Sequence, residues 1–336
     1  MQTIYHPSPI KMKIQLMTVA LLFQGLSMLA QPSQTPVKLH GALHVEKNQM
    51  VDKAGLPPQL RGISLSWSLW QGKKYYNPDV VEWLVKDFKI SLLRASMGVQ
   101  PEGGYLTNRE EQLKLMTTVI DKAISEGIYV LVDWHDHNAE QHLEESKAFF
   151  TLMAKKYGGV PNVIYEIFNE PAQQSWEVVK SYSIGLIKTI RQFDKKNIIV
   201  IGSPNWDQDV DVAAADPITG FDNLAYSFHF YASDPNHQEK LRTKADKAKE
   251  LGIPLFVTEW GVGESNGNGE FNRAKTAAWL EWMELNRLSW ATWNLTDKIE
   301  TTAILLPGAP ENGGWKIENL SESGKYIREQ LLRLNK

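Results

Sequence analysis

Short apolar segments and amphipathic segments alternate along most of the chain. The apolar segments are rich in β-branched and aromatic residues, which is typical of buried strands. Eight of them lie at residues 60–66, 91–97, 128–135, 162–170, 197–204, 224–232, 253–261 and 289–295. The segments between them, such as "PDVVEWLVKDFK", carry apolar residues at helical spacing. Eight strand–helix units of this kind predict an α/β protein whose parallel strands close into a (β/α)8 TIM barrel.

The chain before the first predicted strand has two parts. Residues 42–62, "ALHVEKNQMVDKAGLPPQLRG", predict a β-hairpin at the floor of the barrel. Residues 1–30 combine a short basic start with an apolar stretch, the pattern of a secretory signal peptide, with Met12 as an alternative start. A buried N-terminal helix is the competing interpretation. We therefore expect secretion to the periplasm or the medium, a flexible segment at 31–39 and a barrel domain at 40–336.

Composition narrows the possible partners and chemistry. The 336 residues have a net charge of −3, so there is no basic field that would favour nucleic acid. The absence of cysteine excludes disulfides, thiolate metal sites and a cysteine nucleophile. The 12 tryptophans exceed what a core needs and favour flat platforms for a ligand, although all of them could be core residues. We expect a monomer that, once the signal peptide is removed, binds no membrane.

Charged and aromatic residues collect at the ends of the predicted strands, where a barrel of this type carries its chemistry. They are Trp67, Trp70, Arg94, His135, Asn169, Glu170, Trp206, His229, Tyr231, Glu259, Trp260, Trp293 and Asn294. Glu170 and Glu259 each end an apolar strand, three units apart. Two carboxyl groups that face each other across a cleft suit cleavage of a glycosidic bond, because one must donate a proton while the other is ionised.

The segments that carry these residues resemble those of glycoside hydrolase family 5, in its bacterial endoglucanase (cellulase) branch. The matching segments are "IYEIFNEP", "VTEWG", "SFHFYA", "LLRASMGVQPEGGYL", "DWHDHNAE" and "ATWNLTDKIE", and the similarity covers residues 40–335. It implies a retaining endo-β-1,4-glucanase that acts on cellulose-type glucans or cello-oligosaccharides without a cofactor. In that enzyme Glu170 would be the general acid/base and Glu259 the nucleophile. A mannan or a mixed-linkage glucan is the alternative substrate.

The resemblance also implies contacts between substrate and eight further residues, which are Arg94, His135, Asn169, His229, Tyr231, Trp293, Lys298 and Glu300. Arg94 and Tyr231 would hold the nucleophile ionised and aligned, and Trp293 would form the floor of the cleavage subsite. Trp206, Trp67 and Trp70 are expected to meet glucose units further along the cleft. The segment "SLSWSLWQG" departs from the family pattern after the first strand, which leaves open whether Trp67 or Trp70 contacts substrate.

Two other interpretations compete with a two-glutamate hydrolase. His135 and His137 could bind a metal, but later strand ends offer only His229 as a further histidine. A non-catalytic sugar-binding barrel would keep the tryptophans, yet it would not need both glutamates. Glu166 has the same strand parity as Glu170 but would lie about 13 Å further down a straight strand. We expect Glu166 to be a buried, paired residue of the barrel interior.

Overall fold

The protein is described by a computed structural model that covers residues 1–4 and 34–335. The predicted signal peptide lies outside the described residues apart from its first four, so that prediction is not tested. Among the described residues, no helix combines the length and the apolar character needed to cross a bilayer.

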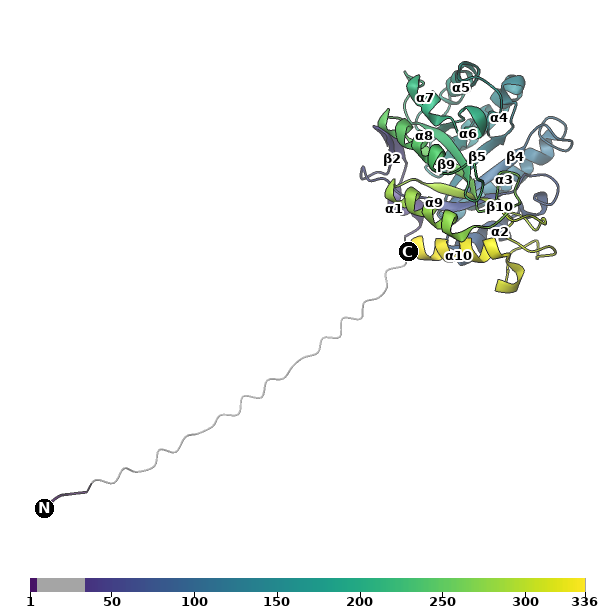
Figure 1. The fold of residues 1–336 in the computed structure, drawn as a ribbon. Helices are drawn as coiled ribbons and strands as arrows, with labels where there is room; N and C mark the ends of the chain where they lie inside the picture. Colours follow the sequence, from purple (N-terminus) through teal and green to yellow (C-terminus); the bar gives the residue numbers. More distant parts are fainter. Residues whose placement is uncertain (5–33, 336) are drawn as a thin grey trace. The chain divides into compact units, whose positions relative to one another are not determined.

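Eight parallel strands form a closed barrel in the order β3 to β10, with β10 paired to β3 (Figure 1). The strands are β3 (Arg61–Leu65), β4 (Leu92–Gly98), β5 (Tyr129–His135), β6 (Val163–Glu166), β7 (Ile199–Ile201), β8 (Leu224–Tyr231), β9 (Leu255–Gly261) and β10 (Trp290–Leu295). Each overlaps one of the eight predicted segments. The predicted (β/α)8 barrel is therefore confirmed.

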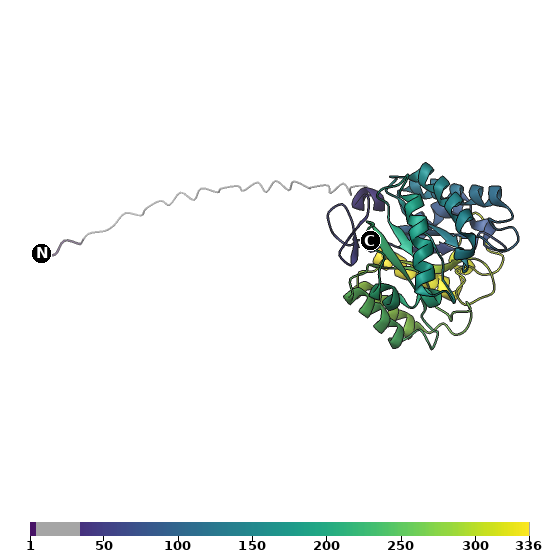
Figure 2. The same ribbon diagram turned by 90° about the horizontal axis from the view of Figure 1, so that it is seen from above.

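Helices surround the strands on the outside of the barrel (Figure 2). They are α2 (Pro78–Trp83), α3 (Arg109–Glu126), α4 (Leu143–Tyr157), α5 (Trp176–Ile190), α6 (Pro204–Asp207), α7 (Val210–Ala215), α8 (Glu239–Glu250), α9 (Arg273–Leu285) and α10 (Glu322–Leu334), with short helical turns η1 (Lys73–Tyr75), η2 (Leu84–Phe88), η3 (Ala139–His142) and η4 (Ile317–Asn319). The apolar residues of each long helix repeat at helical spacing and are buried, as Val179, Leu186 and Ile190 are in α5. This packing fixes the strands, and therefore the side chains at their ends.

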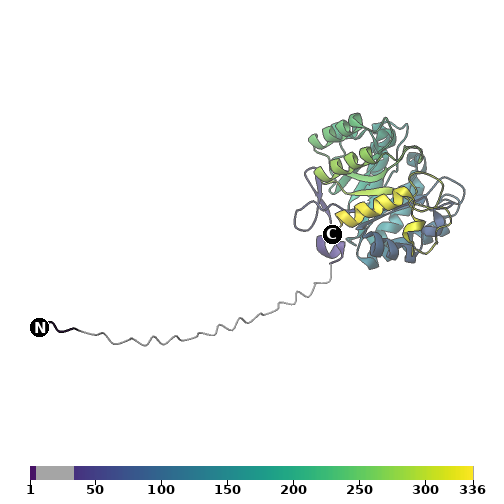
Figure 3. The ribbon, with the colours of Figure 1, turned by 60° about the horizontal axis from the view of Figure 1, so that its bottom comes forward.

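A hairpin of β1 (His44–Glu46) and β2 (Gln49–Val51) covers the floor of the barrel, as predicted. Leu43 and Met50 pack in one cluster with residues at the starts of barrel strands, including Leu92 and Tyr129. Residues 36–40, expected to be mostly flexible, form helix α1 (Pro36–His40). Figure 3 shows α10, in yellow, leading to the C-terminus.

Strand β6 is shorter than predicted. It ends at Glu166, not at residue 170, and Glu170 has a left-handed backbone conformation with φ of +52°. The amides of Ile167 and Asn169 still bond to Val200 O at 3.1 Å and Trp134 O at 3.3 Å, which keeps the segment against the neighbouring strands. A left-handed residue followed by a proline cannot extend a strand. Glu170 therefore sits on a turn above the barrel.

Candidate active site

Glu259 lies in β9, where two strong donors hold its carboxylate. Its Oε1 accepts the hydroxyl of Tyr231 at 2.7 Å, and its Oε2 accepts Nη1 of Arg94 at 2.7 Å. The side chain is almost completely buried. One donor is a cation and the other a hydroxyl, and together they engage both carboxylate oxygens. The position and orientation of the Glu259 carboxylate are therefore fixed.

Arg94, fully buried in β4, joins several strand ends. Its Nε donates to Glu166 at 2.7 Å, its Nη2 donates to Asn169 Oδ1 at 2.7 Å, and Nη2 lies 3.0 Å from Asp133. Burial alone would lower the pKa of Arg94, but the surrounding carboxylates raise it well above its ordinary value. Arg94 is a permanent cation that aligns the nucleophile candidate with Asn169.

Glu166 is buried and paired, as predicted. Burial alone would raise its pKa, but Arg94 lowers it to about 2. The estimate that Glu166 lies about 13 Å from Glu170 is wrong for the side chains. Both carboxylates lie beside the ring of His229, Glu166 at 3.8 Å from Nε2 and Glu170 at 3.0 Å from Nδ1. The strand ends at Glu166, and the turn after it brings Glu170 back over the same ring.

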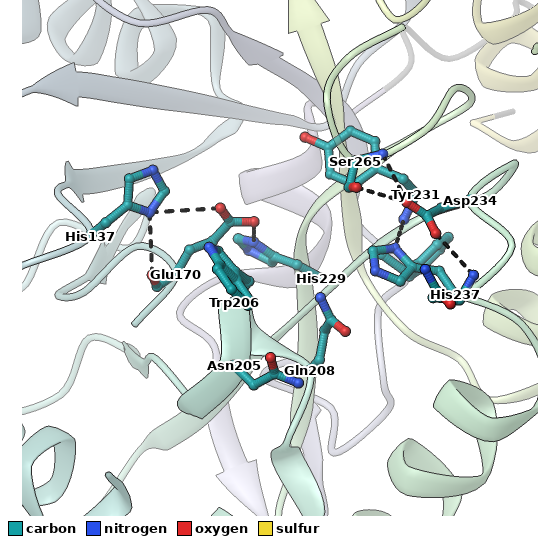
Figure 4. A pocket seen from close by; sticks show the side chains of 12 residues that line it. His137, Glu170, Asn205, Trp206, Gln208, His229, Tyr231, Asp234, His237 and Ser265 are labelled. Carbon is teal, nitrogen blue, oxygen red and sulfur yellow. Dashed lines mark hydrogen bonds and ion pairs between the residues drawn. The ribbon is translucent and has the colours of Figure 1, made fainter. Parts of the chain in front are cut away.

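Glu170 is surrounded by groups that can exchange protons. Figure 4 shows its carboxylate between the rings of His229 and His137. Oε1 is 3.0 Å from Nδ1 of His229, and Oε2 is 3.8 Å from Nδ1 of His137. The backbone N–H of Glu170 donates to Asp207 Oδ2 at 3.0 Å. Burial would raise the pKa of Glu170, but the hydrogen bond to His229 and the charge of that ring hold it below its ordinary value.

The two glutamates are close enough to act on the same bond. One carboxylate oxygen of Glu170, one of Glu259 and one ring nitrogen of His229 all lie within 4.8 Å of one another. The two carboxylates and the His229 ring already make hydrogen bonds with each other, with Arg94 or with Tyr231, so we assign no metal to them. His135 and His137, the pair that could bind a metal judging from the sequence, have ring centres 6.2 Å apart. His135 turns its Nδ1 to Asp133 at 2.7 Å.

Two adjoining cavities meet at the glutamates. The cavity we call the Trp206 cavity has a volume of about 490 Å³ and is lined by His137, Glu170, Asn205, Trp206, Gln208, His229, Phe230, Tyr231, Asp234, Asn236, His237 and Ser265. The cavity we call the Trp293 cavity has a volume of about 480 Å³, and its lining includes Trp67, Trp70, His135, Glu170, Tyr231, Glu259, Asn266, Trp293, Lys298 and Glu300. Glu170 and Tyr231 line both. A bound chain in both cavities would therefore pass the two carboxylates.

The structure brings most of the predicted binding residues to the walls of these cavities. Arg94 and Asn169 lie fully buried beneath them. Within residues 1–4 and 34–335, no group accepts a hydrogen bond from the buried Nδ2 of Asn169, which leaves a donor beside the glutamates. Trp293 has its ring parallel to that of His135, with 3° between the planes and 5.3 Å between centres. Glu300 accepts Nδ2 of Asn294 at 2.9 Å.

Trp67 and Trp70, between which the sequence could not decide, both line the Trp293 cavity. Their ring centres are 5.6 Å apart, and the planes are tilted by 49°. Trp70 is 63% exposed, whereas the Trp67 ring packs edge-on against His135 at 4.3 Å. Trp70 is thus the free platform, while Trp67 belongs to the wall beside the glutamates.

Sequence reasoning missed several residues of the Trp206 cavity and its base. Asp207 follows Trp206 in "NWDQDVD", which resembles an ordinary polar loop. His237 accepts the N–H of Tyr231 on Nδ1 at 2.9 Å, which puts the ring proton on Nε2. Asp234 bonds to the hydroxyl of Ser265 at 2.7 Å and so links the loops after β8 and β9. Asp207 and Asp234 give no local signal because their contacts join residues 37 and 31 positions apart, whereas Tyr231 and His237 are only six positions apart.

A TIM barrel that places two glutamates in an aromatic cleft at its strand ends has the fold and site of a glycoside hydrolase. The family model described as cellulase (glycosyl hydrolase family 5) matches residues 51–299. The chain belongs to this family.

Relatives and solved structures agree with that assignment. The chain is 45% identical to Endoglucanase Z of Dickeya dadantii over 270 residues, which are 80% of this chain and 61% of the relative. It is 38% identical to Endoglucanase N of Pectobacterium atrosepticum over 304 residues, covering 89% of this chain and 67% of the relative. The chain thus spans about three fifths to two thirds of these relatives.

Two solved structures superpose on most of the barrel. The catalytic domain of an endoglucanase from Thermobifida fusca has a TM-score of 0.84 at 32% identity, covering 89% of this chain and 100% of that chain. A structure from Cytophaga hutchinsonii has a TM-score of 0.87 at 44% identity, covering 90% of this chain and 98% of that chain. A further structure of the Thermobifida fusca domain is described as a complex with cellotetraose.

Proposed function

We propose that this protein is a retaining endo-β-1,4-glucanase that cleaves cellulose-type glucans and cello-oligosaccharides. The observation that carries the proposal is the placement of the Glu170 and Glu259 carboxylate oxygens within 4.8 Å of each other. Inverting glycosidases separate their carboxyl groups by about 6.5–9.5 Å to admit a water, whereas retaining enzymes keep them about 5–5.5 Å apart. The short separation supports direct attack by a carboxylate.

The contacts divide the work between the two glutamates. Glu259, bonded to Arg94 and Tyr231, is the carboxylate that attacks the anomeric carbon. Glu170 donates a proton to the departing glycosidic oxygen and then removes one from the water that hydrolyses the glycosyl-enzyme. The unpartnered amide of Asn169 is available to the sugar hydroxyl next to the reacting carbon.

Cleavage inside a chain is supported by the two cavities. They are of similar volume and lie on both sides of the glutamates, so that sugar units can bind on either side of the scissile bond. Trp206 and Trp70, the exposed tryptophans at their walls, offer flat faces to pyranose rings. The names of the relatives and the cellotetraose complex of the Thermobifida fusca domain agree with a β-glucan substrate.

The test is product analysis on a panel of polymers. Carboxymethylcellulose, barley glucan, mannan and xylan are incubated in parallel, and release of reducing ends is compared with the fall in viscosity. We expect a rapid loss of viscosity on the first two, and proton NMR of fresh product should show the β anomer before mutarotation. Initial α product would overturn the retaining mechanism, and a preference for mannan would overturn the substrate assignment. Binding without any hydrolysis would favour a sugar-binding barrel.

We also propose that the protein is exported, as the N-terminal pattern suggests, and that it acts as a monomer. N-terminal sequencing of protein recovered from periplasm and medium tests export, and cleavage near residue 30 is the expected result. An intact N-terminus on cytoplasmic protein would contradict it. Light scattering of the processed protein tests the monomer.

A further inference from the structure

The proposed acid/base role of Glu170 raises a question about its proton, and the inference below rests on that role. Glu170 must be protonated before it can protonate the leaving oxygen. In the structure, however, its hydrogen bond to His229 holds its pKa below the ordinary value. In each cycle Glu170 regains its proton from the water that hydrolyses the glycosyl-enzyme, so the open point is which neighbouring group helps it to keep that proton as the pH rises.

Asp207 lies behind Glu170 and has no exposed surface. Its Oδ2 accepts the backbone N–H of Glu170 at 3.0 Å, and its Oδ1 accepts the N–H of Ser203 at 2.6 Å. The same Oδ2 is 3.6 Å from Nδ1 of His229, the nitrogen that contacts Glu170 at 3.0 Å. One ring nitrogen thus faces two carboxyl groups.

An unusual backbone conformation and a backbone hydrogen bond hold Asp207 next to Glu170. Asn205, Trp206 and Asp207 have φ of +58°, +55° and +58°, a conformation that non-glycine residues rarely adopt even singly. The N–H of Trp206 donates to Pro171 O at 2.9 Å, next to Glu170. The loop that carries the Trp206 platform is therefore bound directly to the turn that carries the acid/base candidate.

The surroundings favour a proton on this buried group. Burial raises the pKa of Asp207 to about 8, with a smaller rise from Glu170 and a lowering by His229. Burial alone would lower the pKa of His229, but Asp207 and the two glutamates beside the ring raise it well above its ordinary value. The other titratable or charged groups that face this trio are Glu166, Glu259, His135, His137, Tyr231 and Arg94.

We propose that Asp207 is a positioning residue that holds the turn of Glu170 and keeps a proton available to it through His229. The proton on Nδ1 of His229 moves to Oε1 of Glu170, which leaves a neutral ring with a free lone pair. The proton on Asp207 then moves to that lone pair. The ring is again a cation, Asp207 has become a carboxylate, Glu170 is an acid, and the total charge is unchanged.

The inference predicts a shift of the basic limb of the pH profile. Because the pKa of Asp207 is raised, it retains its proton up to about pH 8 and releases it as the pH rises through that value. Asp207→Asn removes this proton, so Glu170 is reprotonated only at the expense of His229. The basic limb of kcat/KM on cello-oligosaccharides should move to lower pH by about one unit or more, a loss of about tenfold at alkaline pH.

Two comparisons separate a proton function from a structural one. An aryl cellobioside with a good leaving group needs no acid in its first step, so its kcat/KM should change little in Asp207→Asn. Asp211→Asn is the matched control, since Asp211 lies in α7 and pairs with Lys247 at 3.4 Å, not with the glutamates. Asp207→Ser, which is smaller but can still accept one N–H, is a second variant without a carboxyl group, and it should shift the limb in the same direction.

An unshifted limb in folded Asp207→Asn or Asp207→Ser would overturn the inference. So would an equal loss on both substrates at every pH, which is the result of a merely structural role. The proposed function fails separately: if Glu170→Ala keeps full activity on cello-oligosaccharides, Glu170 is not the acid. If Glu170→Ala loses that activity while Asp207→Asn keeps the parent profile, only the role of Asp207 is wrong.

Discussion

The two walls of the cleft hold their glutamates in opposite ways. Glu259 lies within strand β9, where Arg94 and Tyr231 each donate to one of its oxygens. Neither donor gives up its proton near neutral pH. Burial and the neighbouring Glu259 raise the pKa of Tyr231 well above its ordinary value, and the carboxylates around Arg94 raise its pKa against the effect of burial.

Glu170 lies outside the regular strands, on a left-handed turn, and its partners can all exchange protons. His229 contacts its carboxylate, and Asp207 accepts its backbone N–H. The difference matches the chemistry of the two roles. A nucleophile must stay ionised in one position, whereas an acid/base must lose and regain a proton in each cycle. Rigid donors suit the first role, and a chain of titratable groups suits the second.

Glu259→Gly should have the largest effect on turnover, because it removes the carboxylate that attacks the sugar. We expect turnover to fall on the order of 10⁵–10⁶-fold. Azide can enter the vacated space on the nucleophile's side and should restore cleavage, giving an α-glycosyl azide. The product is identified by NMR. A β-glycosyl azide from this variant would mean that the roles of Glu259 and Glu170 are the reverse of those proposed.

Glu170→Ala should have the next largest effect, and it should depend on the leaving group. Loss of the acid should lower kcat/KM on cello-oligosaccharides by about 10²–10⁴-fold and spare the first step on an activated aryl cellobioside. Azide should now give the β-glycosyl azide. Glu145→Ala, an exposed change on α4, is the control and should behave as the parent enzyme. Equal losses on both substrates would contradict the assignment of the acid.

Trp293→Ala tests the floor of the cavity on the Glu259 side. The negative face of an indole should favour a sugar that gains positive charge at the transition state more than a neutral one. An interaction made mainly in the transition state lowers kcat and kcat/KM together when it is lost. We expect steady-state kinetics on cello-oligosaccharides to show kcat and kcat/KM falling together. The fall should correspond to about 1–2 kcal/mol of lost transition-state stabilisation. A change in KM alone would make Trp293 a simple platform.

The surroundings of Glu259 could be predicted from the sequence far better than the surroundings of Glu170. Strand composition and helical periodicity located the eight strands, and barrel geometry then placed Glu259 and Tyr231 at one rim. The roles of Arg94 and Asn169 came from the family resemblance, since nothing local shows that a guanidinium will bridge several strand ends. In the structure Arg94 donates to Glu259 and to Asn169, and the substrate contacts of these residues stay a prediction.

The turn at Glu170 could not be predicted, because an apolar run that ends in a proline is compatible with a strand up to residue 170. Strand β6 ends at Glu166, and Glu170 adopts a left-handed conformation in which its N–H donates to Asp207 from another loop. The contact joins residues 37 positions apart and depends on complete burial. Such a contact follows from tertiary packing, which is why "NWDQDVD" gives no signal of its own.

Trp206→Ala should have the smallest effect on activity. It tests whether the cavity on the Glu170 side only binds substrate or also supports the acid/base turn. Trp206 is 44% exposed and lines the cavity on the Glu170 side, where we expect a sugar unit to keep its relaxed chair. Its stacking is then equally strong in the ground state and in the transition state, so its loss should raise KM and leave kcat unchanged. A stacking contact of about 0.5–1.5 kcal/mol predicts a rise in KM of about 2- to 10-fold.

The rise should appear only on oligosaccharides long enough to reach that cavity, which a series of increasing length can show. Phe193→Ala is the matched control, because Phe193 is 41% exposed and packs beside Lys155, outside both cavities. Trp206 also precedes Asp207 in the strained loop, so a lost side chain that loosens the loop would disturb the acid/base turn. In that case kcat would fall and the basic limb would shift as in Asp207→Asn. A pure KM effect would instead show that the platform and the proton source are independent functions of one loop.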